Sequence, residues 1–266
     1  HTSHRTFLKA VQKGIEQMAS DVDQLFLCGF SFGALLSMVS VDVSEKIAGV
    51  IAVAPPIALN ERYEWIIRFH KLVSWASERL RWGYIDKQMS HTRYYSHCCE
   101  FFKSVVKIKG MRHKINHEIP VFMVVSDDDE TVQPQRVVAD FHRNRHALSR
   151  MIYYSNRPFH LTDQRIDVRA SAYPDQNIID FSHICYLSSP DNPYHGRHGK
   201  YRDFVHYKNK EYEGCHDIVL GAASTKNLAH HTVQRLTYNP DFEAMAQTMN
   251  DFMRTVISAT TVAESR

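Results

Sequence analysis

The feature that most constrains this chain is a serine between two glycines, placed between an apolar run and a stretch that can form a helix. Residues 29–33 read Gly-Phe-Ser-Phe-Gly, with the apolar run 25–28 before them and the helix-compatible run 34–41 after them. A strand, a tight turn and a helix in this order force the central residue into a strained backbone conformation that exposes its hydroxyl. Small residues are needed two positions before and after it, because strand and helix pass close together there. Ser31 is therefore the first candidate for a nucleophile.

The length and composition of the chain favour a single domain with an insertion. With 266 residues, 44% of them hydrophobic, the chain can bury one substantial core and carry an insertion. Lys and Arg total 32 against 29 Asp and Glu, a balance that argues against a nucleic-acid partner or an anionic membrane. No apolar stretch reaches the 18 residues that a membrane span requires.

Cysteine usage suggests a reducing compartment. The five cysteines are odd in number and irregularly spaced, so no disulfide framework is implied. No targeting segment is visible, and we expect a cytoplasmic location.

The hydrophobic pattern alternates between strand-like and helix-like segments. The expected strands are 23–28, 47–54, 119–125, 150–154 and 177–181. The expected helices are 5–19, 33–41, 134–148 and one that begins at 239–240 and closes the chain. A strand, a helix and a second strand in this order predict a parallel sheet with right-handed crossovers. The expected fold class is therefore α/β, with a mostly parallel sheet and helices on both of its faces.

Residues 57–117 interrupt this alternation of strands and helices. They begin with an expected amphipathic, aromatic-rich helix over 60–81. We interpret the segment as an inserted helical cap between the core halves 1–56 and 118–266. Large apolar side chains over a pocket recognise apolar ligands. We expect Phe30 and, from the cap, Trp65 and Phe69 to line the site.

A serine hydroxyl becomes a nucleophile when an imidazole takes its proton and a carboxylate orients that imidazole. The acid is expected in a loop after a later parallel strand. The loop after strand 119–125 offers four carboxylates, Asp127, Asp128, Asp129 and Glu130.

At this point the chain resembles the α/β-hydrolase superfamily, closest to its carboxylesterase and monoacylglycerol-lipase-like branch. In that branch the acid loop reads G-x-x-D-x-x-V-x-P. Here Ser126 replaces the glycine, while Asp129, Val132 and Pro134 fill the remaining positions. The resemblance implies that Asp129 is the acid, with Asp127 and Asp128 as alternatives.

The base must be chosen among 17 histidines. In this superfamily it follows the serine and the acid along the chain. His183 ends the run 178–183, just after the expected strand 177–181, and resembles the histidine after the last catalytic strand of some bacterial esterases. His160 is the alternative, because it follows strand 150–154 at a more usual separation from Asp129.

Charge stabilisation at the reacting carbonyl needs two backbone N–H donors. The Phe32 N–H, next to the nucleophile, is the expected first donor. The resemblance places the second in an early loop with an H-G motif, which does not precede Ser31 here. We therefore expect that the early strands of the fold are missing and that the chain is N-terminally incomplete.

No metal or cofactor is expected. Four histidines and a cysteine crowd one region, but their spacing fits no zinc pattern; they are His195, His198, His206, Cys215 and His216. Neither a phosphate-binding loop nor a dinucleotide-binding glycine motif is present.

These features predict a serine hydrolase that cleaves a small-molecule carboxylic ester, with an apolar acyl group, through an acyl-enzyme. Two alternatives stay open. One is a catalytically inactive, hydrolase-like binding or scaffold module. The other is a thioesterase or peptidase that uses the same machinery.

Overall fold

The computed structural model describes residues 3–61, 69, 104–157, 163–200, 203–204 and 218–264. Within them, the longer sheet has the strand order β1-β2-β3-β4-β5 and the shorter has the order β6-β8-β7. The first sheet comprises β1 (Leu25–Phe30), β2 (Ile47–Val53), β3 (Val121–Ser126), β4 (Arg150–Tyr154) and β5 (Ile166–Arg169). The second comprises β6 (Asp203–Phe204), β7 (Ile218–Gly221) and β8 (Thr232–Arg235). The labelled helices are α1 (His4–Ala19), α2 (Phe32–Val39), α6 (Pro134–Phe141), α7 (Thr225–His230) and α8 (Phe242–Glu264).

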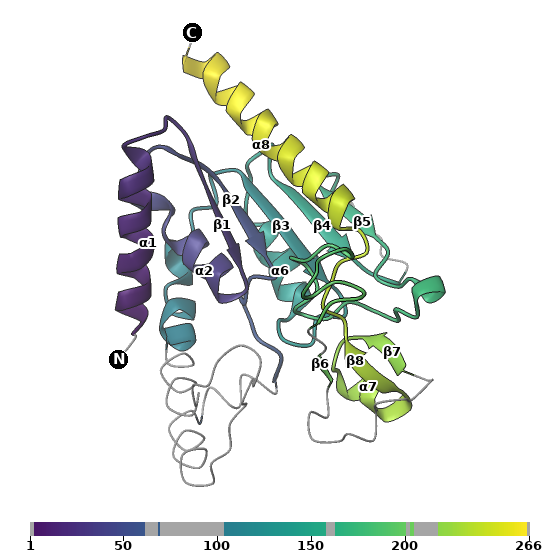
Figure 1. Cartoon of the computed structure of the whole chain (residues 1–266). Coiled ribbons are helices and arrows are strands. Elements are labelled where there is room, and N and C mark those ends of the chain that lie inside the picture. The colour runs from purple at the N-terminus through teal and green to yellow at the C-terminus, as the bar shows by residue number, and fades with distance from the viewer. Residues whose placement is uncertain are drawn as a thin grey trace.

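All neighbouring strands of the five-stranded sheet run parallel. Phe30 of β1 lies beside Val53 of β2, which lies beside Val124 of β3. The carboxyl ends of these strands therefore meet at one edge of the sheet, where Figure 1 shows the loops of the chain gathering. The predicted α/β class, with a parallel sheet, is confirmed for the described residues.

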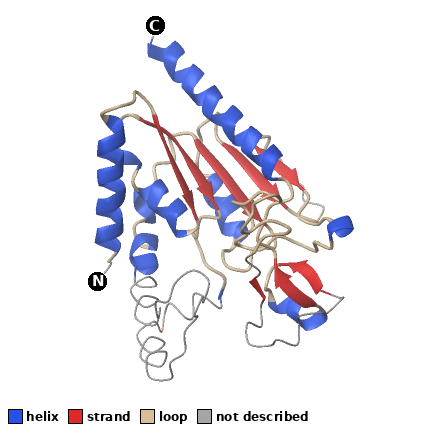
Figure 2. Cartoon of the chain, viewed as in Figure 1, coloured by secondary structure: helices blue, strands red, loops and turns tan. Residues whose placement is uncertain are grey.

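Helices cover both faces of this sheet (Figure 2). Alternate strand residues point to opposite faces, so Met123 and Val124 of β3 belong to two different hydrophobic clusters. The first cluster joins the sheet to α2 and α6, with α1 packed against it. The second joins the sheet to α8 through Met245, Phe252 and Val256. Among the described helices, none is long and apolar enough to cross a membrane.

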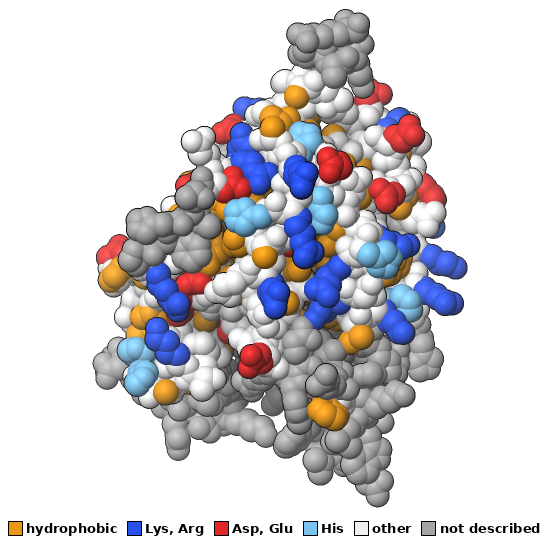
Figure 3. All heavy atoms as spheres, turned by 180° about the vertical axis from the view of Figure 1, so that it is seen from behind, with side chains coloured by type: hydrophobic (Ala, Val, Ile, Leu, Met, Phe, Trp, Pro, Cys, Tyr) orange, Lys and Arg blue, Asp and Glu red, His pale blue; other side chains and the backbone are white. Residues whose placement is uncertain are grey.

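The positive charge of the chain is unevenly distributed. Figure 3 views the molecule from the side opposite to Figure 1, and Lys and Arg side chains predominate in the middle of that face. On α1, the basic residues Arg5, Lys9 and Lys13 are all exposed, with a spacing of four residues that aligns them along the helix. Although the net charge is only +3, part of the surface is therefore strongly basic.

The sequence prediction was wrong for the segment 177–181. This segment is not a strand: Asn177 adopts a left-handed conformation with φ 57°, and Ile178 forms only isolated bridges, to Tyr173 and Leu220. The fifth strand of the sheet is instead β5, a segment of four residues (Ile-Asp-Val-Arg) that was not predicted from the sequence. Strand β4 consequently lies inside the sheet, between β3 and β5.

The predicted helix 134–148 ends early, at Phe141. The side chain of Asn144 explains this ending, because its oxygen accepts the N–H of His146 and the hydroxyl of Ser149. Its amide group donates to the carbonyl of Ile119. These bonds hold residues 142–149 in turns that lead directly into β4. The predicted cap lies mostly outside the described residues; within it, 104–109 are helical.

The close approach of β1 and α2 requires a glycine at position 29 but not at position 33. A Cβ atom on Gly29 would overlap the backbone of Gly33 and Ala34. A Cβ atom on Gly33 would meet no described atom within 4 Å. The sequence argument assigned the same need to both glycines, and the structure limits it to Gly29.

We expect Gly29→Ala to destabilise the fold strongly, by about 3 kcal/mol or more, because backbone atoms cannot move aside as a flexible side chain can. Gly33→Ala is the matched control and is expected to change stability by no more than about 1 kcal/mol. Urea unfolding followed by circular dichroism measures both changes. Equal stability losses in the two variants would contradict the asymmetry.

Candidate active site

Ser31 occupies a sharp turn between β1 and α2, which we call the Ser31 turn. Its φ of 50° and ψ of −120° are unusual for a residue with a side chain. The turn is held from both sides: the Ser31 N–H donates to the carbonyl of Val53, and the Ser31 carbonyl accepts the N–H of Leu35. Such a conformation costs on the order of 1–3 kcal/mol and persists only where the surroundings enforce it.

The structure brings Ser31, His183 and Asp129 together. The Nε2 atom of His183 lies 2.8 Å from the Oγ atom of Ser31. The Nδ1 atom lies 3.0 and 2.9 Å from the two carboxylate oxygens of Asp129. Ser31 and His183 are 152 residues apart in the chain, so this contact depends on the tertiary fold. His183 and Asp129 are buried, with 7% and 5% of their surfaces exposed.

Asp129 is fixed in the loop between β3 and α6 by further hydrogen bonds. Its Oδ1 accepts the backbone N–H groups of Thr131 and Val132, at 2.9 and 3.0 Å. Its Oδ2 accepts the hydroxyl of Tyr186 at 3.1 Å. These partners hold the carboxylate in one orientation, with both of its oxygens near Nδ1 of His183.

Tyr186 was not anticipated from the sequence. Its fully buried hydroxyl donates to Asp129 and accepts the N–H of Ser126 at 2.9 Å, so it ties the end of β3 to the carboxylate. Burial raises the pKa of this hydroxyl well above its usual value, which keeps it protonated and able to donate. One of 13 tyrosines, in a stretch without regular periodicity, gave no distinguishing signal.

The two alternative acids have other partners. Asp127 accepts the hydroxyl of Tyr153 at 2.8 Å and lies 3.3 Å from Arg157. Asp128 accepts the hydroxyl of Ser171 at 2.6 Å. Burial, with smaller contributions from Asp180 and Asp127, raises the pKa of Asp128 to about 6. Neither carboxylate has a hydrogen bond to His183 in the described part of the chain.

Glu130, the fourth carboxylate of the loop, contacts the backbone of the histidine instead. Its Oε2 accepts the main-chain N–H of His183 at 2.9 Å. Its Oε1 lies 3.0 Å from the Nε atom of Arg235, at the end of β8. Burial raises the pKa of Glu130, and the positive charge of Arg235 opposes that rise. Neither contact was predicted from the sequence.

The remaining predicted site residues divide between the described and undescribed parts of the chain. The ring of Phe30 lies 5.2 Å from the imidazole of His183, centre to centre. Phe32 is the first residue of α2, so its backbone N–H belongs to the helix N-terminus beside Ser31. Phe69 is described and 43% exposed. Trp65 and the alternative base His160 lie outside the described residues.

No group of three or more potential metal ligands occurs among the described residues. Of the five clustered residues noted in the sequence, only His195 and His198 fall within the part that the structure describes.

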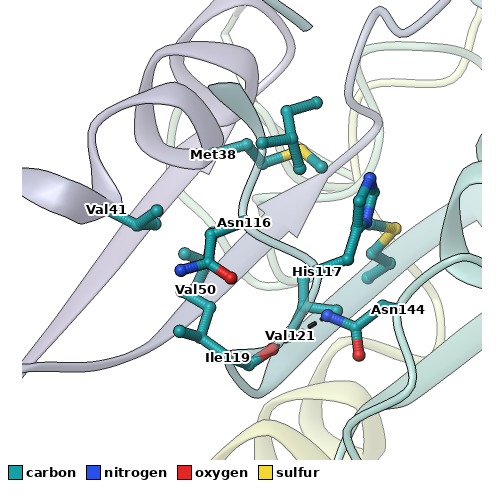
Figure 4. Close-up of a pocket in the computed structure, with 10 residues that line it drawn as sticks. Met38, Val41, Val50, Asn116, His117, Ile119, Val121 and Asn144 are labelled. Atoms are coloured by element: carbon teal, nitrogen blue, oxygen red, sulfur yellow. Dashed lines mark hydrogen bonds between the residues drawn. The ribbon is translucent and has the colours of Figure 1, made fainter. Parts of the chain in front are cut away.

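A separate, mostly apolar hollow lies at the opposite end of the sheet (Figure 4). Its volume of about 260 Å³ includes its open mouth. Met38 from the end of α2 and Val121 from the start of β3 are among the residues that line it, and His117 and Asn144 add polar groups. These positions belong to the amino-terminal edge of the sheet, whereas Ser31 and Asp129 follow the carboxyl ends of their strands. The hollow is therefore distinct from the Ser31 site.

No protein-family model and no curated protein matches this sequence. Solved structures that resemble it include a monoacylglycerol lipase from Paleococcus ferrophilus, with 20% identity and a TM-score of 0.45 over 59% of this chain and 66% of that one. An esterase from Pyrococcus furiosus has 15% identity and a TM-score of 0.36, over 58% and 53% of the two chains. A soluble variant of monoglyceride lipase from Saccharomyces cerevisiae, bound to a substrate analogue, has 14% identity and a TM-score of 0.40, over 59% and 62%. The matched region spans roughly one half to two thirds of each of these proteins.

We expect Tyr186→Phe to lower the free energy of unfolding by about 1–3 kcal/mol, because the variant leaves the buried N–H of Ser126 without its acceptor. Tyr238→Phe is the matched control. The Tyr238 hydroxyl is also buried but has no hydrogen-bond partner among the described residues, so its removal is expected to be neutral or stabilising. Chemical denaturation measures both. A loss in Tyr238→Phe as large as that in Tyr186→Phe would contradict the assignment.

The raised pKa of Asp128 predicts a pH-dependent stability effect. The folded state binds this proton more tightly than the unfolded state, whose pKa is near 3.8. The free energy of unfolding is therefore unaffected by this group below about pH 4. It falls as the pH rises from about 4 to about 6, and it stays lowered above pH 6. Asp128→Asn keeps an acceptor for Ser171 and removes the charge. It is expected to stabilise the protein by about 1–3 kcal/mol at pH 8, and the gain is expected to vanish at pH 4. Thermal unfolding across this range, with the exposed Asp175→Asn as control, checks the prediction.

Proposed function

We propose that this chain is a serine hydrolase that cleaves carboxylic esters through an acyl-enzyme. The observation that supports this function is the continuous hydrogen-bonded path from Ser31 through His183 to Asp129 at the carboxyl edge of a parallel sheet. In this proposal Ser31 is the nucleophile, His183 is the general base and then the general acid, and Asp129 orients the imidazole.

The reaction proceeds in two halves. In the first, the Oγ atom of Ser31 attacks the carbonyl carbon of the ester while Nε2 of His183 takes the hydroxyl proton. The tetrahedral intermediate collapses, the bond to the alcohol oxygen breaks, and that oxygen receives the proton from His183. In the second half, a water molecule attacks the acyl–Ser31 carbonyl and gives its proton to His183, which returns it to Ser31 as the acid leaves.

Negative charge on the carbonyl oxygen of the intermediate needs backbone donors. The N–H of Phe32 is the proposed first donor, because it follows Ser31 directly and begins α2. A helix N-terminus carries a partial positive charge that favours a developing anion nearby. Ser31 thus attacks the carbonyl carbon of the substrate, and the N-terminus of α2 stabilises the charge on the oxygen of the same carbonyl group.

The acyl portion of the substrate is proposed to be apolar. Phe30, whose ring lies beside the imidazole of His183, supplies apolar surface next to the reacting atoms. Phe69 and Trp65 of the proposed cap are assigned to the same acyl site from their place in the sequence. An aromatic wall favours a hydrocarbon chain, because burial of apolar surface is worth roughly 25 cal/mol per Å².

Ser31→Ala is expected to lower the turnover of a p-nitrophenyl ester by several orders of magnitude, without unfolding the protein. A fluorophosphonate probe is expected to label the natural chain and not this variant, since only an activated serine reacts. Ser258→Ala, at an exposed position of α8, serves as the control and is expected to retain both properties. A folded natural chain that takes no label and cleaves no ester would favour the inactive binding module.

The choice of base is tested by a second pair of variants. His183→Asn is expected to reduce both turnover and labelling about as severely as Ser31→Ala, because members of such a relay act as one unit. His160→Asn is expected to leave both nearly unchanged. The reverse result would transfer the role of base to His160.

A further inference from the structure

We infer that Glu130 and Arg235 form a positioning pair that holds His183 between Ser31 and Asp129. This inference rests on the proposed function and extends it to two residues that would not touch the substrate. It follows from the way in which the loop around His183 is attached to the rest of the fold.

The loop carrying His183 has no strand of its own to fix it. The segment 179–183 contains neither helix nor strand. Regular backbone pairing therefore cannot set the height of the imidazole above the sheet. The required precision has to come from individual contacts to the loop.

Two adjacent contacts attach this loop to the end of β8. The hydroxyl of Ser182 donates to the carbonyl of Leu236 at 2.6 Å. The N–H of the next residue, His183, donates to Glu130, whose other oxygen is paired with Arg235. Residues 182–183 are thus joined to residues 235–236, directly and through one carboxylate.

The chemistry of the pair suits a positioning role. A carboxylate that is 8% exposed is costly to bury unless it is paired and hydrogen-bonded. Glu130 has both kinds of partner, and its hydrogen bond to the His183 backbone is charge-assisted and therefore stronger than a neutral one. Because Glu130 follows Asp129 directly in the chain, one loop holds His183 at two points, its side chain and its backbone.

The test compares three variants by steady-state kinetics and by proton NMR. Glu130→Ala removes the acceptor and is expected to lower kcat about 10- to 100-fold with little change in KM, since small displacements of a reacting group are costly. Glu130→Gln keeps an acceptor for the His183 N–H and is expected to recover most of that loss. Asp241→Asn is the control, because it removes the charge from a partly buried ion pair with Arg169 of β5, away from His183. It is expected to lower stability while leaving kcat unchanged.

The NMR readout separates this inference from the proposed function. A proton shared between Nδ1 of His183 and Asp129 gives a far-downfield resonance, identified by its absence in His183→Asn. We expect Glu130→Ala to lose or broaden it, and Glu130→Gln and Asp241→Asn to retain it. An inactive natural chain that shows these NMR changes would refute the proposed function and leave the positioning pair standing. A Glu130→Ala variant that is folded and keeps both the resonance and its kcat would overturn the pair. If Glu130→Ala does not fold, Arg235→Ala, which removes the ion-pair partner of Glu130, is expected to broaden the resonance, and a folded Arg235→Ala variant that keeps both the resonance and its kcat would overturn the pair.

Discussion

The parallel pairing of β1, β2 and β3 is the constraint on which the rest of the site depends. Parallel strands end at the same edge of a sheet, and β2 alone separates the strand before Ser31 from the strand before Asp129. The two side chains are therefore presented on the same side of the molecule, at a separation that a single imidazole can bridge. His183 enters from a third segment and fills that position. The separation of Ser31 and Asp129 is thus set by the order of the strands at this edge of the sheet.

Four consecutive carboxylates after β3 show how strongly position decides chemistry. Asp127 lies against Tyr153 and Arg157, and Asp128 accepts the hydroxyl of Ser171. Asp129 faces an imidazole, while Glu130 holds a backbone N–H and an arginine. Similar functional groups at neighbouring positions therefore carry different partners. The sequence therefore predicts an acidic turn, but it does not predict that the four carboxylates have different partners.

Much of this arrangement could be predicted from the sequence, because local signals were strong where the chain is regular. The apolar runs gave β1 to β4, and the glycines around Ser31 gave the turn. The spacing of Asp129, Val132 and Pro134, together with the family resemblance, singled out Asp129. The histidine was selected for a partly mistaken reason: residues 177–181 form no strand.

The parts that were missed depend on tertiary contacts. Strand β5 has only four residues and lies in a mostly polar stretch, so that it is defined by its pairing with β4. Tyr186 contacts Ser126 and Asp129, which are 60 and 57 positions away in the chain. Arg235 contacts Glu130, which is 105 positions away. Periodicity carries no information about such contacts. Charge and residue type alone gave no means of choosing these side chains over others of the same kind.

The wide separation of the site residues along the chain also has a consequence for folding. Ser31, Asp129, His183 and Arg235 come from four distant segments, so no local fragment can assemble the constellation. Contacts of this range carry a large loop-closure cost and form slowly. A folding intermediate that contains only β1 to β3 would expose the serine without His183, the proposed base. The Ser31 hydroxyl would therefore have the low reactivity of an ordinary serine until the last segments have docked. The nucleophilic reactivity proposed for Ser31 would then appear only once folding is complete.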